Sequence, residues 1–166
     1  SIQDYPKEGI LFRDITTLLK DKDAFKLAID KMAEQVKDKK VDLIVGAESR
    51  GFLIGSALAY KMNCGFIPVR KKGKLPYKTI SEEYDLEYGT DTLYMHEDAI
   101  KKGDNVLVVD DLIATGGTAL AMIKMVEKLG GNVIGSSFLI ELEELNGRKE
   151  IEKYPINILI KYWLFN

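Results

Sequence analysis

The chain has 166 residues, a length that suits a single domain. Hydrophobic residues make up 46% of it, enough for a folded core and too many for a disordered chain. The formal net charge of −2 argues against a basic nucleic-acid-binding surface, and no apolar run approaches the roughly 20 residues of a membrane helix. The single cysteine excludes an internal disulfide and a cysteine-rich zinc site. We therefore expect a cytoplasmic domain that binds neither nucleic acid nor a membrane.

Helical and extended patterns alternate along the chain. Apolar residues recur at helical spacing from Phe25 to Val36, with Asp21 or Asp23 as a cap, and two further helices are expected over 51–62 and from Gly117 up to the glycine pair 130–131. Apolar runs predict strands over 41–46, 65–70, 105–110, 132–140 and 156–160. Pro68 indicates an edge or irregular position in the second of these. Valine-, isoleucine- and leucine-rich strands separated by helices predict an α/β fold, with a mainly parallel five-stranded sheet covered by helices on both faces.

Two stretches do not fit that alternation. One is the turn-rich start of the chain, 4–21, and the other is the charged segment 71–89, which glycine and proline interrupt. Long loops in compact domains usually carry function or move. Ligands of open parallel sheets bind beyond the carboxyl ends of the strands, so the turns after Val45, Val69, Val109 and Ile140 are the places to search.

The turn after the 105–110 strand has the composition of a phosphate site. Asp110 and Asp111 end the apolar run, and a short polar turn leads directly into the next helix: Ala114, Thr115, Gly116, Gly117 and Thr118. A helix start offers unsatisfied N–H groups to an anion, and glycines let the backbone approach it closely. Ionised carboxylates only accept hydrogen bonds, so the two aspartates suit hydroxyl groups. A ribose 5-phosphate satisfies both halves of the motif.

Two conditions accompany this interpretation. Consecutive side chains of a strand point to opposite faces, so at least one aspartate is expected past the strand end, with a bend at Leu112. A helix cap by Thr115 or Thr118 is the structural alternative, and it can coexist with phosphate binding. Walker and Rossmann fingerprints are absent, because the chain has no G-x-x-x-x-G-K-[ST] and no G-x-G spacing.

The stretch "VLVVDDLIATGGTA" (106–119) resembles the phosphoribosyl-diphosphate (PRPP) motif of the type I phosphoribosyltransferases. Three more stretches, "YPKEGILFRDIT" (5–16), "GAESRGFLIG" (46–55) and "PVRKKGKLP" (68–76), followed by "YDLEYGTDTL" (84–93), narrow the resemblance to the adenine phosphoribosyltransferase family. They stand in the family's order and spacing and cover nearly the whole chain. Members usually begin with a short additional helical segment, so the N-terminus is expected to be shortened. The resemblance implies one domain over 1–166, with a hood over about 1–20 and a lid over about 71–95.

Two stretches could bind the diphosphate of PRPP. Arg50 offers a charged fork at a helix start, and the resemblance implies that its loop, with Glu48 and Ser49, contacts the diphosphate and holds a non-proline cis peptide near Glu48–Ser49. The structural alternative pairs Glu48 with Arg50. Cations cluster after the 65–70 strand, where they could neutralise a diphosphate, although such a run in isolation is more often a solvated surface. The resemblance implies that Lys71 and Lys74 contact the diphosphate. By resemblance, Arg70 reaches across a homodimer into the partner's site.

The resemblance also assigns the lid and the base site. Glu87 is the candidate for handling a proton on the purine, and Tyr88 positions the lid or contacts the diphosphate; an ordinary charged β-ribbon is the alternative. Tyr94 stands where members usually have an acidic residue, and His96 is assigned no catalysis. Phe12 can stack on a purine ring. The resemblance places backbone groups of Leu11 and Arg13 at the base edge and Leu142 on the other face of the ring.

These features predict transfer of ribose 5-phosphate from PRPP to adenine, giving AMP and diphosphate. Positioning and electrostatics would supply the catalysis, with Mg²⁺ held through PRPP and water rather than by direct protein ligands. The alternatives are a phosphoribosyltransferase for xanthine or guanine, a non-catalytic PRPP-binding regulator, and the phosphate-binding domain of a multidomain synthetase.

Overall fold

The computed structural model describes residues 2, 3, 11, 12, 14–86 and 88–163. Its centre is a five-stranded sheet in the order β4-β3-β7-β8-β9, and every neighbouring pair in it is parallel. The strands are β3 (Leu43–Ala47), β4 (Gly65–Val69), β7 (Asn105–Ile113), β8 (Asn132–Leu142) and β9 (Ile156–Tyr162). The predicted five-stranded α/β fold is confirmed, and β7, β8 and β9 extend beyond the predicted strand ends.

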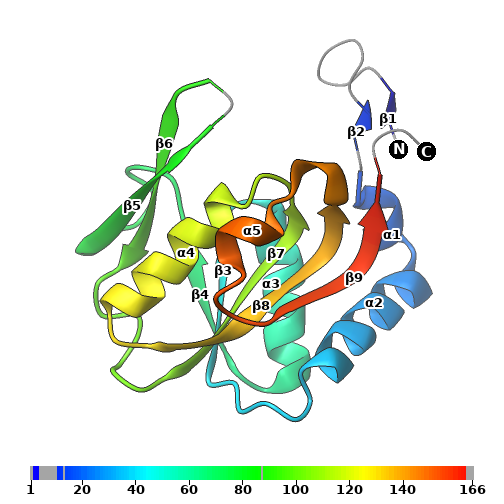
Figure 1. The fold of residues 1–166 in the computed structure, drawn as a ribbon. Coiled ribbons are helices and arrows are strands. Elements are labelled where there is room, and N and C mark those ends of the chain that lie inside the picture. Colours follow the sequence, from blue (N-terminus) through cyan, green and yellow to red (C-terminus); the bar gives the residue numbers. More distant parts are fainter. Residues whose placement is uncertain (1, 4–10, 13, 87, 164–166) are drawn as a thin grey trace.

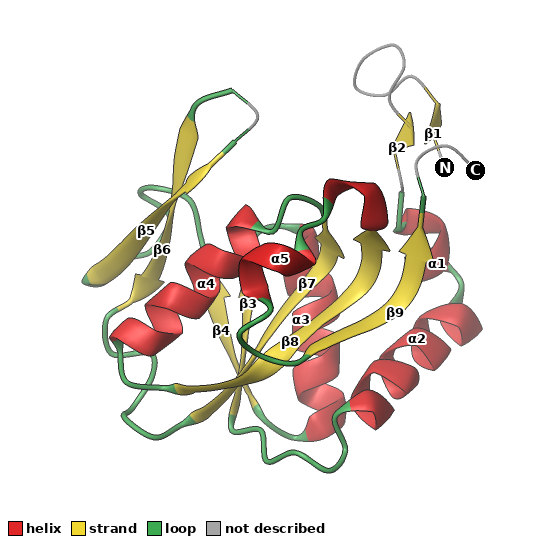
Figure 2. Ribbon diagram, viewed as in Figure 1, coloured by secondary structure: helices red, strands yellow, loops and turns green. Residues whose placement is uncertain are grey.

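Helices cover both faces of this sheet (Figures 1 and 2). One face carries α2 (Lys22–Gln35) and α3 (Arg50–Met62), and the other carries α4 (Gly117–Lys128) and α5 (Arg148–Ile151). The shorter elements α1 (Thr16–Lys20) and η1 (Glu143–Leu145) precede α2 and α5. Asp21 caps α2 by accepting from the N–H groups of Asp23 and Ala24, as one of the two predicted caps.

Alternation along β7 explains the two-sided cover. Val106 and Val108 pack in the cluster on the α4 side, whereas Leu107 and Val109 pack in the cluster on the α3 side, and all four are 0% exposed. A strand buried on both faces reads as a continuous apolar run, which is why the sequence predicts it well. The carboxyl end of such a strand is the place where polar side chains can begin.

Pro68 lies in β4, which is an edge strand of the sheet. Proline has no N–H to donate to a second neighbour, so the edge position accommodates it. This confirms the prediction of an edge position for the 65–70 strand.

Two antiparallel strand pairs stand outside the central sheet (Figure 1). The ribbon of β5 (Thr79–Asp85) and β6 (Thr90–His96) overlaps the predicted lid segment and ends one residue beyond it. Backbone hydrogen bonds tie it to the end of β4, because Arg70 and Tyr94 each donate an N–H to the other's carbonyl at 2.9 and 2.8 Å. The pair β1 (Ile2–Gln3) and β2 (Leu11–Phe12) lies in the predicted hood segment.

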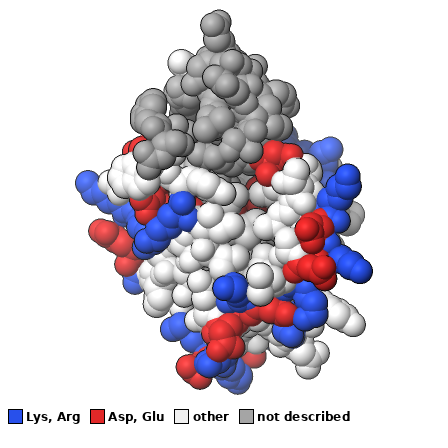
Figure 3. Space-filling model, turned by 90° about the vertical axis from the view of Figure 1, so that its right-hand side faces the viewer, with Lys and Arg blue, Asp and Glu red and all other residues white. Residues whose placement is uncertain are grey.

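The side of the molecule that carries the edge strand β9 has an uncharged central area, with lysine, arginine, aspartate and glutamate side chains toward its rim and lower end (Figure 3). Within the described ranges, every helix is too short or too polar to cross a membrane.

Candidate active site

A cavity of about 410 Å³ opens where β3 and β7 end and α3 and α4 begin. Four segments far apart in the sequence therefore meet at one point. Its lining comprises residues 47–51, Lys71, Tyr84, Leu93 and residues 110–119. This is the sheet edge at which ligands of open α/β folds bind.

The glycine-containing turn forms one wall of the cavity. Gly116 has φ 88°, a conformation that favours glycine, and it is the N-cap residue of α4. The cap makes no side-chain hydrogen bond, so the expected capping by Thr115 or Thr118 is wrong. The reason is geometric, because the left-handed Gly116 turns the chain into the helix without a capping hydroxyl. The first N–H groups of α4 therefore have no capping oxygen from the N-cap and lie beside the cavity.

Asp110 and Asp111 both lie within β7, which continues to Ile113. The expectation that one of them lies past the strand end is wrong. Instead the alternation breaks inside the strand: Val109 packs on the α3 side, and a Cβ on Gly51 of α3 would lie 2.7 Å from Asp110 Oδ1, so Asp110 faces the same side. Pairing with β3 ends at Val109, which leaves that edge of β7 open to the cavity.

The two aspartates differ in their partners. Asp111, with a side chain 7% exposed, pairs with Arg50, whose Nε lies 3.0 Å from Oδ2. Its backbone N–H donates to Oδ1 of Asp110 at 2.8 Å. Burial and the neighbouring charge of Asp111 raise the pKa of Asp110 well above its ordinary value. The cavity thus holds a carboxylate fixed by a guanidinium beside a carboxyl group that resists ionisation.

The loop after β3 contains a cis peptide bond between Glu48 and Ser49, at the position that the family resemblance implies. Oε1 of Glu48 accepts from the backbone N–H of Lys71 at 2.7 Å and lies 3.4 Å from Nε of Arg70. Glu48 therefore joins this loop to the end of β4. Arg50 forms an ion pair with Asp111, whereas the contacts of Glu48 described above are with Lys71 and Arg70.

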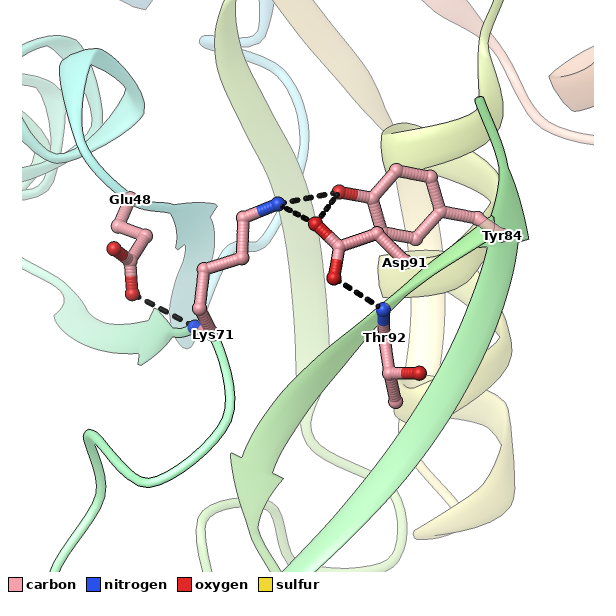
Figure 4. A network of polar contacts seen from close by, with 5 residues as sticks. All are labelled: Glu48, Lys71, Tyr84, Asp91 and Thr92. Atoms are coloured by element: carbon pink, nitrogen blue, oxygen red, sulfur yellow. Dashed lines mark hydrogen bonds and ion pairs between the residues drawn. The ribbon is translucent and has the colours of Figure 1, made fainter. Parts of the chain in front are cut away.

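Lys71 is held at both ends (Figure 4). Glu48 binds its backbone, while its Nζ donates to the carboxylate of Asp91 and, at 2.8 Å, to the hydroxyl of Tyr84. Burial lowers the pKa of Lys71, but the bonds to Asp91 and Tyr84 outweigh burial and leave that pKa above its ordinary value. The bond from Lys71 and the N–H of Thr92 lower the pKa of Asp91. A charged ammonium group is therefore fixed at the cavity wall by the β5–β6 ribbon.

Other predicted site residues lie outside the cavity lining. Arg70 rests against Glu48 with its guanidinium 5.9 Å from the Phe52 ring centre, Lys74 is exposed, and the Tyr88 side chain is 81% exposed. Leu142 ends β8 and packs with the α3-side cluster. The backbone of Leu11 and Phe12 forms β2, whereas their side chains, Arg13 and Glu87 lie outside the described residues.

Tyr84 and Asp91 belong to the site and were not singled out from the sequence. Strand register brings them together, because Tyr84 pairs with Asp91 across the β5–β6 ribbon. The available signal was the alternation on either side of the 86–89 turn, which fixes which residues face each other. Only the placement of the ribbon over Lys71 gives that pair a cation to hold.

The donor set of the site is oxygen-rich. Among residues 2, 3, 11, 12, 14–86 and 88–163 there is no group of three or more histidine, cysteine, aspartate or glutamate side chains that could hold a metal ion. The cavity carboxylates are Glu48, Asp110 and Asp111, which are hard oxygen ligands.

Comparisons with known proteins agree with this geometry. Residues 16–165 match the phosphoribosyl transferase domain family. The chain is 86% identical over 162 residues to an adenine phosphoribosyltransferase of Brachyspira hyodysenteriae, covering 98% of this chain and 95% of the relative. Its fold matches the crystal structure of the Thermoanaerobacter pseudethanolicus adenine phosphoribosyltransferase with a TM-score of 0.94 and 53% identity, covering 97% and 94% of the two chains.

A third match is the Saccharomyces cerevisiae adenine phosphoribosyltransferase, complexed with D-2,5-dideoxy-2,5-imino-altritol 1,6-bisphosphate and adenine. It has a TM-score of 0.89 and 41% identity, and the match covers 95% and 92% of the two chains. The family match, the relatives and the shared fold span nearly all of this chain. The chain therefore belongs to the phosphoribosyltransferase family, and within it to the adenine phosphoribosyltransferases.

Proposed function

We propose that this protein transfers ribose 5-phosphate from PRPP to adenine, producing AMP and diphosphate. The observation that carries the proposal is one cavity that joins the α4 N-terminal loop 114–118, the two aspartates and the cations Arg50 and Lys71. The loop and the cations are groups that bind anions, and the aspartates are acceptors for hydroxyl groups, which together match the phosphates and the ribose of PRPP. The names of the Brachyspira and Thermoanaerobacter relatives support adenine as the base.

PRPP has a natural placement in this cavity. Its 5-phosphate would accept hydrogen bonds from the loop 114–118 at the start of α4. Asp110 and Asp111 would accept from the ribose hydroxyls. The diphosphate would lie against the 48–50 loop and Lys71, whose ammonium group is already held at the wall. We also assign diphosphate contacts to Arg70, Lys74 and Tyr88, none of which lines the cavity in this structure. Tyr88 would reach the diphosphate by movement of the ribbon, and Arg70 would reach the site of a second subunit.

Adenine would bind next to the anomeric carbon of PRPP, under the segment that contains β2. Phe12 would stack on the ring, with Leu142 on its other face. The carbonyl of Arg13 would accept from the exocyclic amine, and the Leu11 backbone would donate to a ring nitrogen. An oxygen at the amine position would leave that carbonyl unpaired, at a cost of about 1–3 kcal/mol, so guanine and hypoxanthine are disfavoured.

Catalysis would rest on position and charge. Adenine N9 would attack the anomeric carbon as the diphosphate leaves, through a transition state with oxocarbenium character. Lys71 and Arg50 would stabilise the negative charge that develops on the leaving diphosphate, and Glu87 would handle the proton on the purine. The ribbon would act as a lid over the site and keep water from the activated sugar.

Magnesium fits this donor set. Asp110 and Asp111 can accept hydrogen bonds from the ribose hydroxyls and from water held by a bound ion, and the site offers oxygen rather than nitrogen or sulfur. When bound with PRPP, Mg²⁺ would neutralise charge on the diphosphate. We further propose, from the family resemblance, a cytoplasmic homodimer in which Arg70 reaches the partner's site.

The deciding experiment measures diphosphate release from PRPP and Mg²⁺ with adenine, hypoxanthine, guanine or xanthine, one base at a time. We expect release with adenine alone and AMP as the co-product. Release with another base would keep the PRPP chemistry and overturn the base assignment. PRPP binding without release for any base would overturn the transferase assignment and indicate a PRPP-binding regulator.

A further inference from the structure

A buried ion pair lies beside the loop 114–118, called the phosphate loop below after its proposed ligand, and outside the cavity lining. Glu141 of β8 has a side chain only 5% exposed, and its Oε2 lies 2.6 Å from Nε of Arg148, the first residue of α5. Oε1 of Glu141 is buried, and it has no hydrogen-bond partner among the residues that the structure describes. A buried carboxylate with one cation as partner fixes that cation strongly, because losing it would leave a buried unpaired charge. Neither residue lines the cavity.

The pair stands directly beside the start of the phosphate loop. Glu141 is the register partner of Ile113, the residue that precedes Ala114. Gly147 precedes Arg148 and is the N-cap of α5. Arg148 thus ties the turn that contains Gly147 to the strand that neighbours β7. The turn, the loop and the strand end form one packed unit.

Gly147 contacts the loop backbone to backbone. A Cβ on Gly147 would lie 2.4 Å from the carbonyl oxygen of Ala114 and 3.0 Å from the backbone nitrogen of Gly116. A Cβ on Gly116 would lie 2.5 Å from the carbonyl oxygen of Gly147. Both glycines are buried, and no side chain fits between the two turns. The backbone at Gly147 therefore limits how closely the loop 114–118 can approach α5.

We infer that Arg148, held by Glu141, is a positioning residue that fixes the loop 114–118 for the 5-phosphate of the nucleotide. This inference rests on the proposed function, which assigns that loop to a 5-phosphate. Arg148 acts through Gly147 and touches no substrate. Phosphate binding by several backbone N–H groups depends on their common orientation, so a small shift of the loop weakens all of those bonds together. The diphosphate side of the cavity, built from the 48–50 loop and Lys71, does not share this support.

The test compares ligands that differ by the 5-phosphate. Calorimetry gives the dissociation constants of AMP, adenosine and diphosphate for the wild type, Arg148→Ala and the control Lys149→Ala, an exposed neighbour on α5. For Arg148→Ala we expect the preference for AMP over adenosine to fall by at least about tenfold. Diphosphate affinity should change by less than about twofold, since its groups lie elsewhere in the cavity. Lys149→Ala should match the wild type.

Two more variants keep the test decisive if Arg148→Ala does not fold. Arg148→Lys retains the cation but loses the planar fork, so the AMP preference should fall by a smaller factor, about threefold. Gly147→Ala leaves the ion pair in place and should lower the AMP preference by displacing the Ala114 carbonyl. An unchanged AMP preference in these variants, or an equal loss for AMP, adenosine and diphosphate, would overturn the inference. A wild type that binds AMP no better than adenosine would instead overturn the phosphate assignment itself.

Discussion

Asp111 is a buried carboxylate that we propose accepts hydrogen bonds from the ribose hydroxyls of PRPP. It is held by Arg50 at 3.0 Å and faces the cavity. We predict that Asp111→Asn lowers kcat/KM for PRPP by about 10- to 100-fold, because an amide is a weaker acceptor for the ribose hydroxyls than a carboxylate.

Steady-state kinetics at saturating adenine measure this effect. Circular dichroism should show an unchanged fold, because asparagine has the same shape as aspartate. The control is Asp38→Asn, which alters an exposed residue between α2 and β3 and should have wild-type kinetics. Wild-type kinetics for Asp111→Asn would remove the residue from the ribose site.

Asp110 is proposed to serve the ribose site, but its ionised form is expected to destabilise the fold. Burial and the charge of Asp111 raise its pKa, so the folded state binds this proton more tightly than the unfolded chain does. The folded state is therefore favoured fully below the ordinary value of 3.8 and loses that advantage as pH rises through the raised pKa. Asparagine has no such loss and can still accept from the Asp111 N–H.

We predict that Asp110→Asn unfolds at a higher temperature than the wild type at neutral pH, by at least about 2–4 °C, the shift produced by about 1 kcal/mol in a chain of this size. The difference should be larger at about pH 8 than at about pH 5. Calorimetric melting at both pH values measures it. A melting temperature below that of the wild type at the higher pH would contradict the raised pKa.

Among the larger elements, the β5–β6 ribbon contributes two side chains to the site. Asp91 and Tyr84 come from its two strands, and together they hold Nζ of Lys71 at the cavity wall (Figure 4). The pair is partly exposed, with Asp91 37% and Lys71 40% accessible, so solvent weakens it. The ribbon thereby lines part of the cavity and is coupled to the group that we propose binds the diphosphate.

We predict that Asp91→Asn raises KM for PRPP by about two- to fivefold, in line with a partly exposed charged pair. The same change in a Lys71→Met background should have little further effect, because the partner is gone. Initial rates at varied PRPP concentration measure it, and Glu83→Gln, an exposed residue on the same ribbon, is the control. A lower KM in Asp91→Asn would mean that Asp91 competes with the diphosphate for Lys71.

At the scale of the whole molecule, the proposed homodimer gives Arg70 a role that a single subunit does not. Within one chain Arg70 lies against Glu48 and Phe52 and does not line the cavity. Mixing Arg70→Ala with Asp111→Asn tests whether it serves the partner. A twofold interface would restore one intact site in each mixed dimer, so random mixing should recover about a quarter of wild-type activity.

Activity is measured after the two impaired variants are unfolded together and refolded, and the residual activity of each variant refolded alone is subtracted as the control. No recovery, from a mixture that chromatography shows to be dimeric, would place Arg70 in its own subunit's site. Recovery of activity in a mixture that is monomeric would exclude both a role for Arg70 in the partner's site and one in its own.

The sequence by itself determined the central sheet. Val106–Val109 are fully buried, and β3 and β8 on either side of them are mostly buried, whereas the edge strands β4 and β9 are largely half-buried. Burial on both faces produces a continuous apolar pattern that has few other interpretations. The sequence also predicts residues 110–118 as part of a ligand site, and they line the cavity, because the groups concerned are contiguous along the chain. Local chemistry of this kind needs no knowledge of distant residues.

Contacts between remote segments could not be predicted from local sequence patterns and are seen only in the tertiary structure. The break in alternation that lets Asp110 face Gly51 depends on where pairing with β3 ends, and the threonine cap fails because Gly116 is packed against Gly147. Tyr84 and Asp91 became site residues only when the ribbon was placed over Lys71. Glu141 and Arg148 are paired only by the packing of β8 and α5, which buries the carboxylate of Glu141 against the guanidinium of Arg148. Each of these outcomes depends on distances between segments that are remote in sequence, and such distances are set by the packing of the whole chain.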